Sequence, residues 1–293
     1  MAETFLITGA TGKISGLVIK ALREQGPSVR ALVRDVTKAA ALSDHGVQLS
    51  PGDFDQPETL VRALDGVTSV FLLTPPHPDD SGMVERFLDV ALKIPTPPRI
   101  VRLSAIKATE GGPTESTRGH GRADRAILES GLPYAILRPS YFMQNLFGSV
   151  DTIMASGTLV PPTGDGRIGF IDVRDIADVA AAVLLDRSWD YGIYDLTGPA
   201  SVTFHDVARD LGTALGRELT YVPVTPGQAR DKALQSGWGE WTAGIMADYT
   251  VAYGKGWGDF TTSFVQKITG HQARSVAQFA HEIFAPALMR GIR

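Results

Sequence analysis

Short apolar segments alternate with helical segments along the first 140 residues of the chain. Two of them, Ser69–Thr74 and Ile100–Ser104, are almost continuously apolar, which is typical of strands covered by helices on both faces of a parallel sheet. This alternation predicts a doubly wound α/β fold with a parallel sheet, because each crossover between parallel strands needs a helix. The expected strands are Thr4–Thr8, Ser28–Val33, Val47–Leu49, Ser69–Thr74, Ile100–Ser104 and Tyr134–Leu137, and the expected helices lie near Ile14–Gln25, Val36–His45, Glu58–Leu64, Met83–Leu92 and Arg122–Ser130.

The pattern changes after Leu137. An aromatic-rich helix and the loop "PPTGDGRIGF" lead into the helical stretch "IDVRDIADVAAAVLL" and then a strand, "YGIYDLTG". Thr203 with Asp206, and Ser275 with Gln278, have the spacing of a capping box at the start of two later helices. We therefore expect two domains: residues 1–140, with a helix near 172–186 that packs back on them, and a smaller α+β lid domain of residues 141–171 and 187–293.

The composition excludes several classes of protein. A hydrophobic content of 43% with 20% charged residues is that of an ordinary globular chain, and a net charge of −4 gives no reason to expect nucleic acid or an anionic membrane as a partner. The absence of cysteine excludes disulfides and thiolate chemistry and fits a reducing compartment. No apolar run reaches the roughly 18 residues of a membrane span and no signal peptide is expected, so we expect a cytoplasmic protein. The histidines show no metal-ligand spacing, and no Gly-x-Ser-x-Gly elbow is present.

A glycine-rich turn, in "TFLITGATGKISG", joins the first strand to the first helix. Gly9 and Gly12 allow a sharp turn and a close approach of the backbone to phosphate oxygens, and free N–H groups at the helix start complement negative charge. Ser15 holds the third small position and still allows close packing of helix on strand. The turn predicts a dinucleotide site. A mononucleotide P-loop is excluded, because Ile7 replaces its first glycine and Ile14 replaces the Ser or Thr that binds Mg²⁺.

The end of the second strand distinguishes the two nicotinamide dinucleotides. A carboxylate there accepts hydrogen bonds from the ribose 2′-hydroxyl, whereas an arginine favours a 2′-phosphate. In "RALVRDVTK", Arg34 ends the strand and Lys38 follows one helical turn later, so we expect NADP(H) in preference to NAD(H). Asp35 is expected to cap the following helix. Alternatively, Arg34 and Lys38 are ordinary solvated charges.

Six segments carry a resemblance to a known family. They are "TGATGKIS", "ALVRD", "GVQLSPGDFDQPETL", "VFLLTPP", "HGRADRAILESGLPYAILRPSYFMQNL" and "FIDVRDIADVAAAVL", and they span most of residues 4–185 in order. In these segments the chain resembles the NmrA-like group of atypical short-chain dehydrogenases/reductases, which includes NADPH-dependent triphenylmethane-dye, quinone and azo reductases. The resemblance implies a Rossmann-type cofactor domain.

The resemblance also implies which residues hold the cofactor. Arg34 would contact the 2′-phosphate, with Lys38 near it, and Asp53 and Phe54 would flank the adenine. Thr74 and Pro75 would lie near the nicotinamide ribose. The residues at the phosphates would be Thr8, Gly9, Ala10, Thr11, Gly12, Lys13 and Ile14.

The expected catalytic pair departs from the wider superfamily, in which a Lys four residues after a Tyr lowers the pKa of the phenol. No Tyr in this chain is followed by Lys at that spacing. His120, with Asp124 four residues on, occupies the matching position, and imidazole titrates near physiological pH and can serve as an acid. Alternatively, His120 is a glycine-flanked loop residue without chemistry. Ser104 ends the fifth strand, where its hydroxyl is a second candidate, and Lys107 is a weaker one.

Aromatic residues suggest the kind of substrate. Tyr141, Phe142 and Asn145 follow the sixth strand and are expected to form a ring-stacking wall with a polar handle; packing in a lid core is the alternative. An aromatic cluster in the C-terminal region agrees with a flat ligand, although core packing explains part of it. This cluster consists of Trp238, Trp241, Tyr249, Tyr253 and Trp257.

Two functional hypotheses follow. Hydride transfer is the chemistry of the cofactor, and a quinone or cationic dye develops far less basicity on reduction than a simple carbonyl does. The missing Tyr/Lys pair therefore favours an NADPH-dependent reductase of electron-poor aromatic acceptors. The alternative is a non-catalytic NAD(P) redox sensor that acts through a protein partner. The sequence leaves a homodimer open and predicts no metal.

Overall fold

The computed structural model describes residues 3–291 and divides into two compact units. The first contains the chain up to Gly112, Ser116–Arg138 and Ile176–Asp195. The second contains Pro113–Glu115, Pro139–Asp175 and the chain from Leu196 on. Each unit has its own buried hydrophobic cluster.

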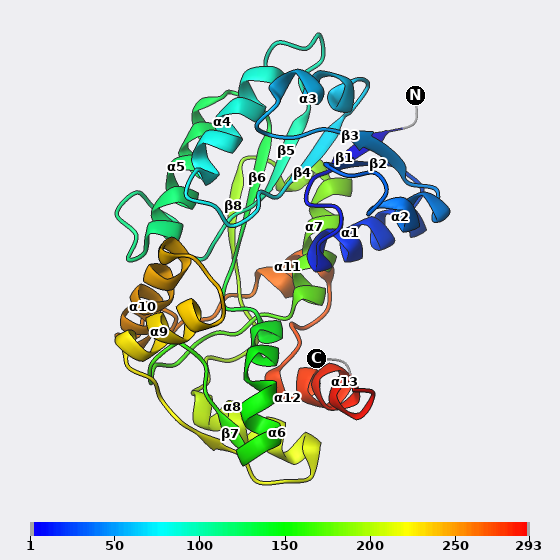
Figure 1. Cartoon of the computed structure of the whole chain (residues 1–293). Helices are drawn as coiled ribbons and strands as arrows, with labels where there is room; N and C mark the ends of the chain where they lie inside the picture. The colour runs from blue at the N-terminus through cyan, green and yellow to red at the C-terminus, as the bar shows by residue number, and fades with distance from the viewer. Residues whose placement is uncertain (1–2, 292–293) are drawn as a thin grey trace. The chain divides into compact units, whose positions relative to one another are not determined.

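The first unit is built on a seven-stranded sheet with the strand order β3-β2-β1-β4-β5-β6-β8 (Figure 1). The register pairs are parallel from β3 to β6, for example Phe5 with Val29 and Phe5 with Ser69. The order reverses between β1 and β4, which makes this the topological switch point where doubly wound sheets bind ligands. The predicted fold class is confirmed. The strands are β1 (Thr4–Ile7), β2 (Ser28–Val33), β3 (Gln48–Pro51), β4 (Ser69–Leu72), β5 (Arg99–Leu103), β6 (Tyr134–Pro139) and β8 (Gly192–Leu196).

Helices cover both faces of this sheet. In Figure 1, α3, α4 and α5 lie on one face, and α1 and α7 lie on the other. Leu60, Phe87 and Ile127 from the first group are fully buried against strand residues such as Val70 and Ile100. This two-sided burial explains why β4 is almost wholly apolar and why all five residues of β5 are buried. The helices are α1 (Lys13–Glu24), α2 (Ala40–Asp44), α3 (Pro57–Leu64), α4 (Asp80–Ala91), α5 (Glu115–Glu129) and α7 (Val173–Leu185).

Three elements differ from the sequence prediction. Helix α2 begins at Ala40 rather than near Val36, because residues 36–39 form turns. Helix α5 begins seven residues before Arg122, through a stretch whose glycines disfavour helix in isolation. Strand β8, expected in the lid domain, lies beside β6 in the main sheet, a long-range pairing that local periodicity does not encode.

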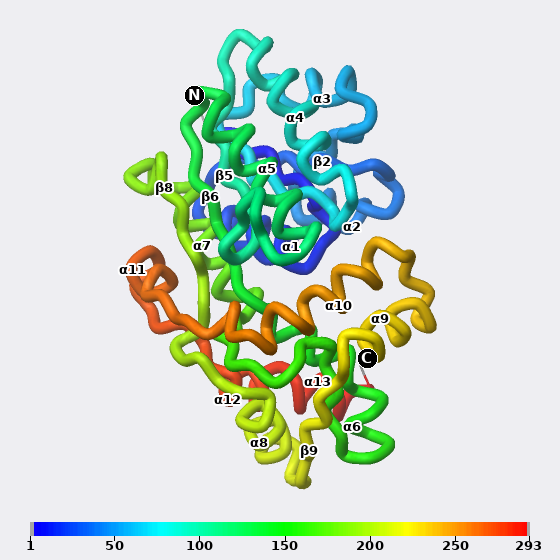
Figure 2. The backbone as a smooth tube through the Cα atoms, turned by 90° about the vertical axis from the view of Figure 1, so that its left-hand side faces the viewer, coloured from blue at the N-terminus to red at the C-terminus, as the bar shows by residue number. Residues whose placement is uncertain are grey.

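The second unit is mixed α+β and is held by an aromatic core. Strands β7 (Thr158–Leu159) and β9 (Thr220–Tyr221) form a short parallel pair. The capping boxes predicted at Thr203 and Ser275 are both present. Helices α9 (Pro226–Gln235) and α10 (Glu240–Gly254) lie side by side in both views (Figures 1 and 2). The remaining elements are the 3₁₀ helix Met143–Ser149, α6 (Val150–Ser156), α8 (Phe204–Leu215), α11 (Phe264–Thr269), α12 (Val276–Phe279), a π-helical turn over Ala280–Phe284 and α13 (Ala285–Met289).

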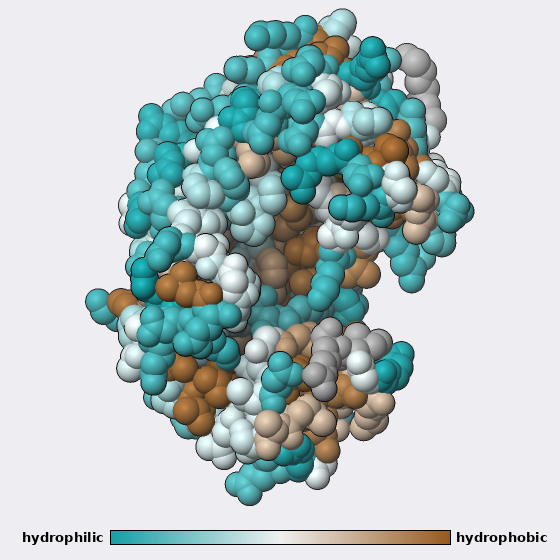
Figure 3. Space-filling model, in the orientation of Figure 1, coloured by the Kyte–Doolittle hydropathy of each residue, from teal (hydrophilic) through white to brown (hydrophobic). Residues whose placement is uncertain are grey.

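The visible surface is largely hydrophilic with scattered apolar side chains (Figure 3), as expected for an ordinary protein surface. Within residues 3–291, no helix combines the length and apolar character needed to cross a membrane.

Candidate functional site

The turn between β1 and α1 requires its glycines. Gly9 has a φ of +58°, a left-handed conformation that favours glycine, and a Cβ atom there would lie 2.8 Å from Cδ2 of Leu73. The N–H of Gly12 donates to the carbonyl of Gly9 at 2.8 Å, which closes the turn. The backbone therefore bends sharply at the carboxyl end of β1, as predicted.

Two buried hydroxyl groups hold this turn against the sheet by hydrogen bonds. The Thr8 hydroxyl donates to the carbonyl of Leu73 and accepts from its N–H, both at 2.8 Å. The Ser15 hydroxyl donates to the carbonyl of Thr8 at 2.9 Å. Both side chains are fully buried. Ser15 thus replaces the third glycine without loss of close packing, because its hydroxyl bonds the strand that the helix packs on.

The beginning of α1 is open to an anion. Gly12 is the N-cap residue and has no side chain with which to cap the helix, and the first turn contains no acidic residue. The N–H groups of a 12-residue helix and its dipole therefore face outward uncompensated, which suits a phosphate. Ala10 and Ile14 are buried, so they support the turn from beneath. The residues on its outer side are Gly9, Thr11, Gly12 and Lys13.

The end of β2 presents basic side chains. Arg34 and Lys38 are exposed, and Arg34 forms no hydrogen bond or ion pair with the residues that the structure describes. Asp35 accepts hydrogen bonds from the N–H groups of Thr37, at 2.9 Å, and Lys38, at 3.3 Å. Asp35 thus caps the turn that precedes α2 rather than the helix itself. This geometry leaves Arg34 as the unengaged cation at the strand end.

The next predicted positions follow β3. Asp53 is half-buried, and its N–H donates to the Thr59 hydroxyl at 3.0 Å, which fixes the loop. The side chain of Phe54 belongs to the core and packs edge-on to Phe87, with ring centroids 6.3 Å apart. Any adenine contact of Phe54 would therefore involve its backbone or ring edge.

Thr74 follows β4 and contacts a group of buried charged residues. Pro75, the next residue, is exposed. The Thr74 hydroxyl donates to the Asp80 carboxylate at the start of α4. The other carboxylate oxygen of Asp80 accepts from Nη2 of Arg102 at 2.8 Å. Burial alone raises the pKa of Asp80, but the Arg102 guanidinium and the hydrogen bonds of His120 and Thr74 outweigh it, and the pKa of this carboxyl lies well below its usual range.

Arg102 is fully buried in the middle of this group and binds two carboxylates. Its Nε lies 3.3 Å from Oδ1 of Asp124, on α5, and its Nη2 serves Asp80. Arg138, from β6, donates to the other oxygen of Asp124 at 2.9 Å. Two guanidinium groups thus balance two carboxylates, which is the condition for burying charge.

The two predicted catalytic residues both join this charged group. The Ser104 hydroxyl donates to Oδ2 of Asp124 at 2.9 Å. Nδ1 of His120 lies 3.1 Å from Nη2 of Arg102 and 3.1 Å from Oδ2 of Asp80. The His120 side chain is 21% exposed, so the ring is held on one side and reaches solvent on the other. The structure therefore brings together Thr74, Ser104, His120 and Asp124.

His120 lies within helix α5, so the alternative that placed it in a glycine-flanked loop is wrong about its position, and its role in catalysis stays a prediction. Its neighbour Gly121 packs against the loop that follows β5: a Cβ atom at Gly121 would lie 2.2 Å from the carbonyl carbon of Thr109. Gly121 thus serves the close packing of helix and loop, whereas a Cβ atom at Gly119 would have space.

Lys107, the weaker candidate, lies in the same loop with a φ of +47°, which is uncommon for a residue other than glycine. Its N–H points at Oδ1 of Asp195, at the end of β8, over 3.5 Å. Burial raises the pKa of Asp195, although Lys107 and Arg138 oppose the shift. Lys107 is placed by its backbone, and its role as a proton donor stays a hypothesis.

The predicted substrate residues lie in the second unit. The Tyr141 ring packs edge-on against Phe170, Phe204 and Tyr253 at centroid distances of 5.4, 6.1 and 5.8 Å. Burial raises the pKa of the Tyr141 phenol well above its ordinary value, so it is a weak acid at neutral pH. Asn145 is exposed and Phe142 is half-buried.

The aromatic residues of the C-terminal region divide into two sets. Tyr253 is buried and stacks on Tyr249, with Trp257 edge-on to it at 5.3 Å. Tyr253 belongs to the core of the second unit, and Tyr249 and Trp257, which are partly buried, pack against that core. Trp238 is 51% exposed, and the indole nitrogen of Trp241 is buried without a partner among the described residues. Core packing thus accounts for the first set.

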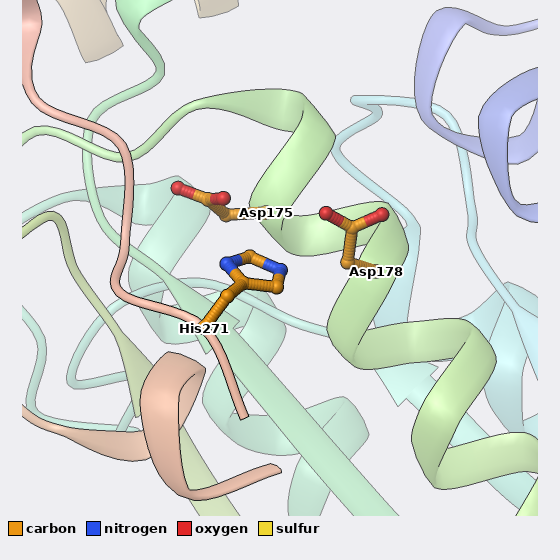
Figure 4. A group of neighbouring side chains, drawn as sticks. All are labelled: Asp175, Asp178 and His271. Atoms are coloured by element: carbon orange, nitrogen blue, oxygen red, sulfur yellow. The ribbon is translucent and has the colours of Figure 1, made fainter. Parts of the chain in front are cut away.

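Two further features of the structure carry no assigned role. A cavity of about 510 Å³ within the second unit is lined by Pro199, residues 261–266, Gln272 and Ala273, none of which was predicted as a site residue. Figure 4 shows Asp175 and Asp178 on α7 and His271 from the loop after α11. Asp175 already accepts from the N–H of Arg274 at 2.7 Å and from its guanidinium, and no metal is assigned to this group.

Sequence reasoning missed Asp80, Arg102 and Arg138. The available signal was a charge inside an apolar strand, since "RIVRLS" places Arg102 where its neighbours Val101 and Leu103 are buried. A buried strand arginine requires a carboxylate partner, and that requirement points to a charged group near this edge of the sheet.

Comparison with known proteins extends these observations. A family model described as NAD(P)H-binding matches residues 9–187. The NAD(P)H azoreductase of Xenophilus azovorans is 34% identical over 275 residues, covering 94% of this chain and 96% of the azoreductase. The structure of Citrobacter sp. triphenylmethane reductase complexed with NADP(H) is 26% identical, with a TM-score of 0.82 and coverage of 94% and 99% of the two chains. The NADPH complex of quinone oxidoreductase QOR2 from Escherichia coli has a TM-score of 0.87 at 24% identity, over 96% and 99% of the two chains, and shows a common fold.

The family match covers more than half of the chain, and the azoreductase likeness extends over nearly all of it. The glycine turn at the switch point provides the local structure that such a family needs. The chain therefore belongs to the NAD(P)H-binding family, within the NmrA-like group of atypical short-chain dehydrogenases/reductases.

Proposed function

We propose that this chain is a reductase that transfers hydride from NADPH to an electron-poor aromatic acceptor of quinone, azo or triphenylmethane type. The observation that carries the proposal is the uncapped glycine turn at the switch point of the sheet, with Arg34 unengaged at the end of the neighbouring strand β2. The relatives named above are reductases of azo, quinone and dye substrates, which supports the choice of acceptor.

The cofactor would be held by three parts of the first unit. The N–H groups of the turn and of the first turn of α1 would bind the diphosphate, and Arg34 with Lys38 would bind the 2′-phosphate. The residues after β3 and β4 would contact the adenine and the nicotinamide ribose. When bound, the nicotinamide supplies the hydride. The residues present fit this group, because the Gly9–Gly12 turn is closed by its own hydrogen bond and no side chain caps the helix start.

The protein would then orient the acceptor and, for a quinone or azo acceptor, deliver one proton. Reduction of a quinone or azo group needs a hydride and a proton, and His120 is the titratable group whose ring reaches solvent from the buried charges. Tyr141 does not suit this task, because burial raises the pKa of its phenol. Tyr141, Phe142 and Asn145 remain proposed substrate contacts, although the packing of the Tyr141 ring favours a core role for that side chain.

A non-catalytic NAD(P) sensor is the second candidate function. The absence of a Tyr/Lys pair favours it, since a sensor needs the turn but no proton donor. The relatives over nearly the full length favour the reductase.

One panel separates the two candidates. NADPH absorbance is followed with a quinone, an azo dye and a triphenylmethane dye, with NADH in parallel. Oxidation that depends on enzyme and acceptor supports the reductase. Tight NADPH binding without oxidation by any acceptor would replace it with the sensor.

A further inference from the structure

A single ring nitrogen of His120 faces both a donor and an acceptor. Nδ1 lies 3.1 Å from Nη2 of Arg102, which only donates, and 3.1 Å from Oδ2 of Asp80, which only accepts when ionised. Nη2 and Oδ2 are themselves joined at 2.8 Å. A bare Nδ1 accepts from Arg102, and a protonated Nδ1 donates to Asp80. Nδ1 therefore has a partner whether or not it carries a proton.

The carboxylate in this anchor is held ionised and in place. Its Oδ1 accepts from the Thr74 hydroxyl, and its Oδ2 accepts from Arg102. Asp80 is 5% exposed and Arg102 is fully buried, so water does not screen their attraction to the ring. The charged groups in contact with His120 are Asp80 from α4 and Arg102 from β5. Arg102 also binds Asp124 on α5, which Arg138 from β6 binds in turn.

The other ring nitrogen has no such partner. Nε2 of His120 makes no hydrogen bond within residues 3–291, and the side chain is partly exposed. We propose that Asp80 and Arg102 are positioning residues that anchor Nδ1 of His120, so that Nε2 is the nitrogen through which the proton passes to the reduced acceptor. This inference rests on the proposed reductase function for the step itself.

With a quinone or azo acceptor, the bound nicotinamide would supply a hydride, and Nε2–H of the imidazolium would give one proton to the reduced acceptor. A cationic triphenylmethane dye becomes neutral on taking a hydride and needs no proton from the ring. The ring is left neutral with its remaining proton on Nδ1, donated to Asp80, and it recovers the lost proton from solvent. A carboxylate that orients an imidazole and stabilises its cation acts in the same way in other enzymes.

The anchor is tested without turnover by NMR of the full chain with ¹⁵N-labelled histidine. We expect one Nδ1–H proton signal, protected from exchange with water at mildly acidic pH, that disappears in H120Q. Asp80→Asn should shift this signal, or the signal should disappear because the proton exchanges rapidly with water. Asp79→Asn is the matched control, because the neighbouring Asp79 is exposed, pairs with Arg86 at 2.9 Å and is expected to leave the signal unchanged. Absence of the signal in the unmodified chain, or its persistence unchanged in folded D80N, overturns the anchor.

The effect on turnover is tested with a double-mutant cycle. H120Q should lower kcat by about tenfold, less than a typical general acid contributes, because water can protonate a delocalised product anion. D80N should lower kcat by about threefold to tenfold, leave KM for NADPH within about twofold, and add no loss in the H120Q background. If the kcat losses of D80N and H120Q were additive, or if D80N changed only KM, the result would show that Asp80 has a structural role and does not act through His120. If D80N fails to fold, the presence of the NMR signal in the unmodified chain and its loss in H120Q still test whether Nδ1 of His120 is anchored. If no acceptor oxidises NADPH, the proposed function fails while the NMR result stands on its own.

Discussion

One exposed arginine decides the proposed cofactor preference. Arg34 stands at the carboxyl end of β2 without a partner among the described residues, whereas the nearby Asp35 is engaged with backbone N–H groups. An unengaged guanidinium at this position suits a 2′-phosphate, and an engaged carboxylate is less able to bind a 2′-hydroxyl.

Arg34→Ala should therefore weaken NADPH binding by about tenfold or more while changing NADH binding by less than about twofold, since a charge-assisted hydrogen bond contributes roughly 1.5–3 kcal/mol. Fluorescence titration with both nucleotides measures this. Arg62→Ala is the control, because Arg62 is an exposed arginine on α3. An equal loss for both nucleotides in R34A would refute the assignment.

The sequence predicts which residues belong to the candidate site better than it predicts which of them contact one another. Ser104 and His120 were predicted separately, and the structure joins them through Asp124, Arg102 and Asp80. Strand ends and motif positions are local properties, so they can be read from the chain. Which carboxylate balances a buried arginine depends on the packing of α4 and α5 on the sheet, and local patterns do not record it.

Helix α5 shows how an element can depend on glycine at one position only. A Cβ atom at Gly121 would lie 2.2 Å from the carbonyl carbon of Thr109, whereas the nearest atom to a Cβ at Gly119 is Nη2 of Arg122 at 3.8 Å. Gly121→Ala should therefore destabilise the chain by about 1–3 kcal/mol or more through overpacking. Gly119→Ala should stabilise it by about 0.5–1 kcal/mol, because alanine is the better helix former. Urea unfolding measures both, and a common sign for the two changes would contradict this account.

The contribution of the α8 capping box to stability depends on pH. Hydrogen bonds from Thr203, first its hydroxyl and then its N–H, together with Arg209, lower the pKa of Asp206 from 3.8 to about 2. A carboxyl whose pKa is depressed on folding stabilises the fold above its unfolded value, near pH 4, and that contribution is lost as the pH falls toward 2.

Asp206→Ala should accordingly lower the free energy of unfolding by about 1 kcal/mol at pH 7, which is the usual range for a lost cap at a partly exposed site. At pH 3 the decrease should be clearly smaller. Chemical unfolding at the two pH values checks this. Asp210→Ala, on the same helix and paired with Arg209 at 3.2 Å, should change stability by no more than about 0.5 kcal/mol at either pH. A D206A cost that is equal at both pH values would show that the carboxylate charge is not involved.

Elements were predictable where a short stretch fixes them. The β–α alternation and the two capping boxes depend on neighbours a few residues apart, and the structure contains them. The start of α5 and the pairing of β8 beside β6 depend instead on contacts between distant segments, such as Gly121 with Thr109. Tertiary packing overrides local preference at those points.

At the scale of the whole molecule, the glycine turn belongs to a unit with its own buried core, so binding of a nucleotide there should raise the thermal stability of the protein. A ligand that binds only the folded state stabilises it by about 2.7 kcal/mol at a hundredfold excess over its Kd. NADPH at that excess should raise the midpoint of thermal unfolding by several degrees, since about 1 kcal/mol corresponds to roughly 2–4 °C in a chain of this size. NADH at the same concentration should raise it less. R34A should lose about half of the NADPH effect or more, because a tenfold weaker affinity lowers the stabilisation at this concentration from about 2.7 to about 1.4 kcal/mol, and it should keep the effect of NADH. Because the shift requires binding but no turnover, it appears for a reductase and for a sensor alike. A midpoint that neither nucleotide moves would therefore argue against the dinucleotide site itself, whatever the outcome of the acceptor panel.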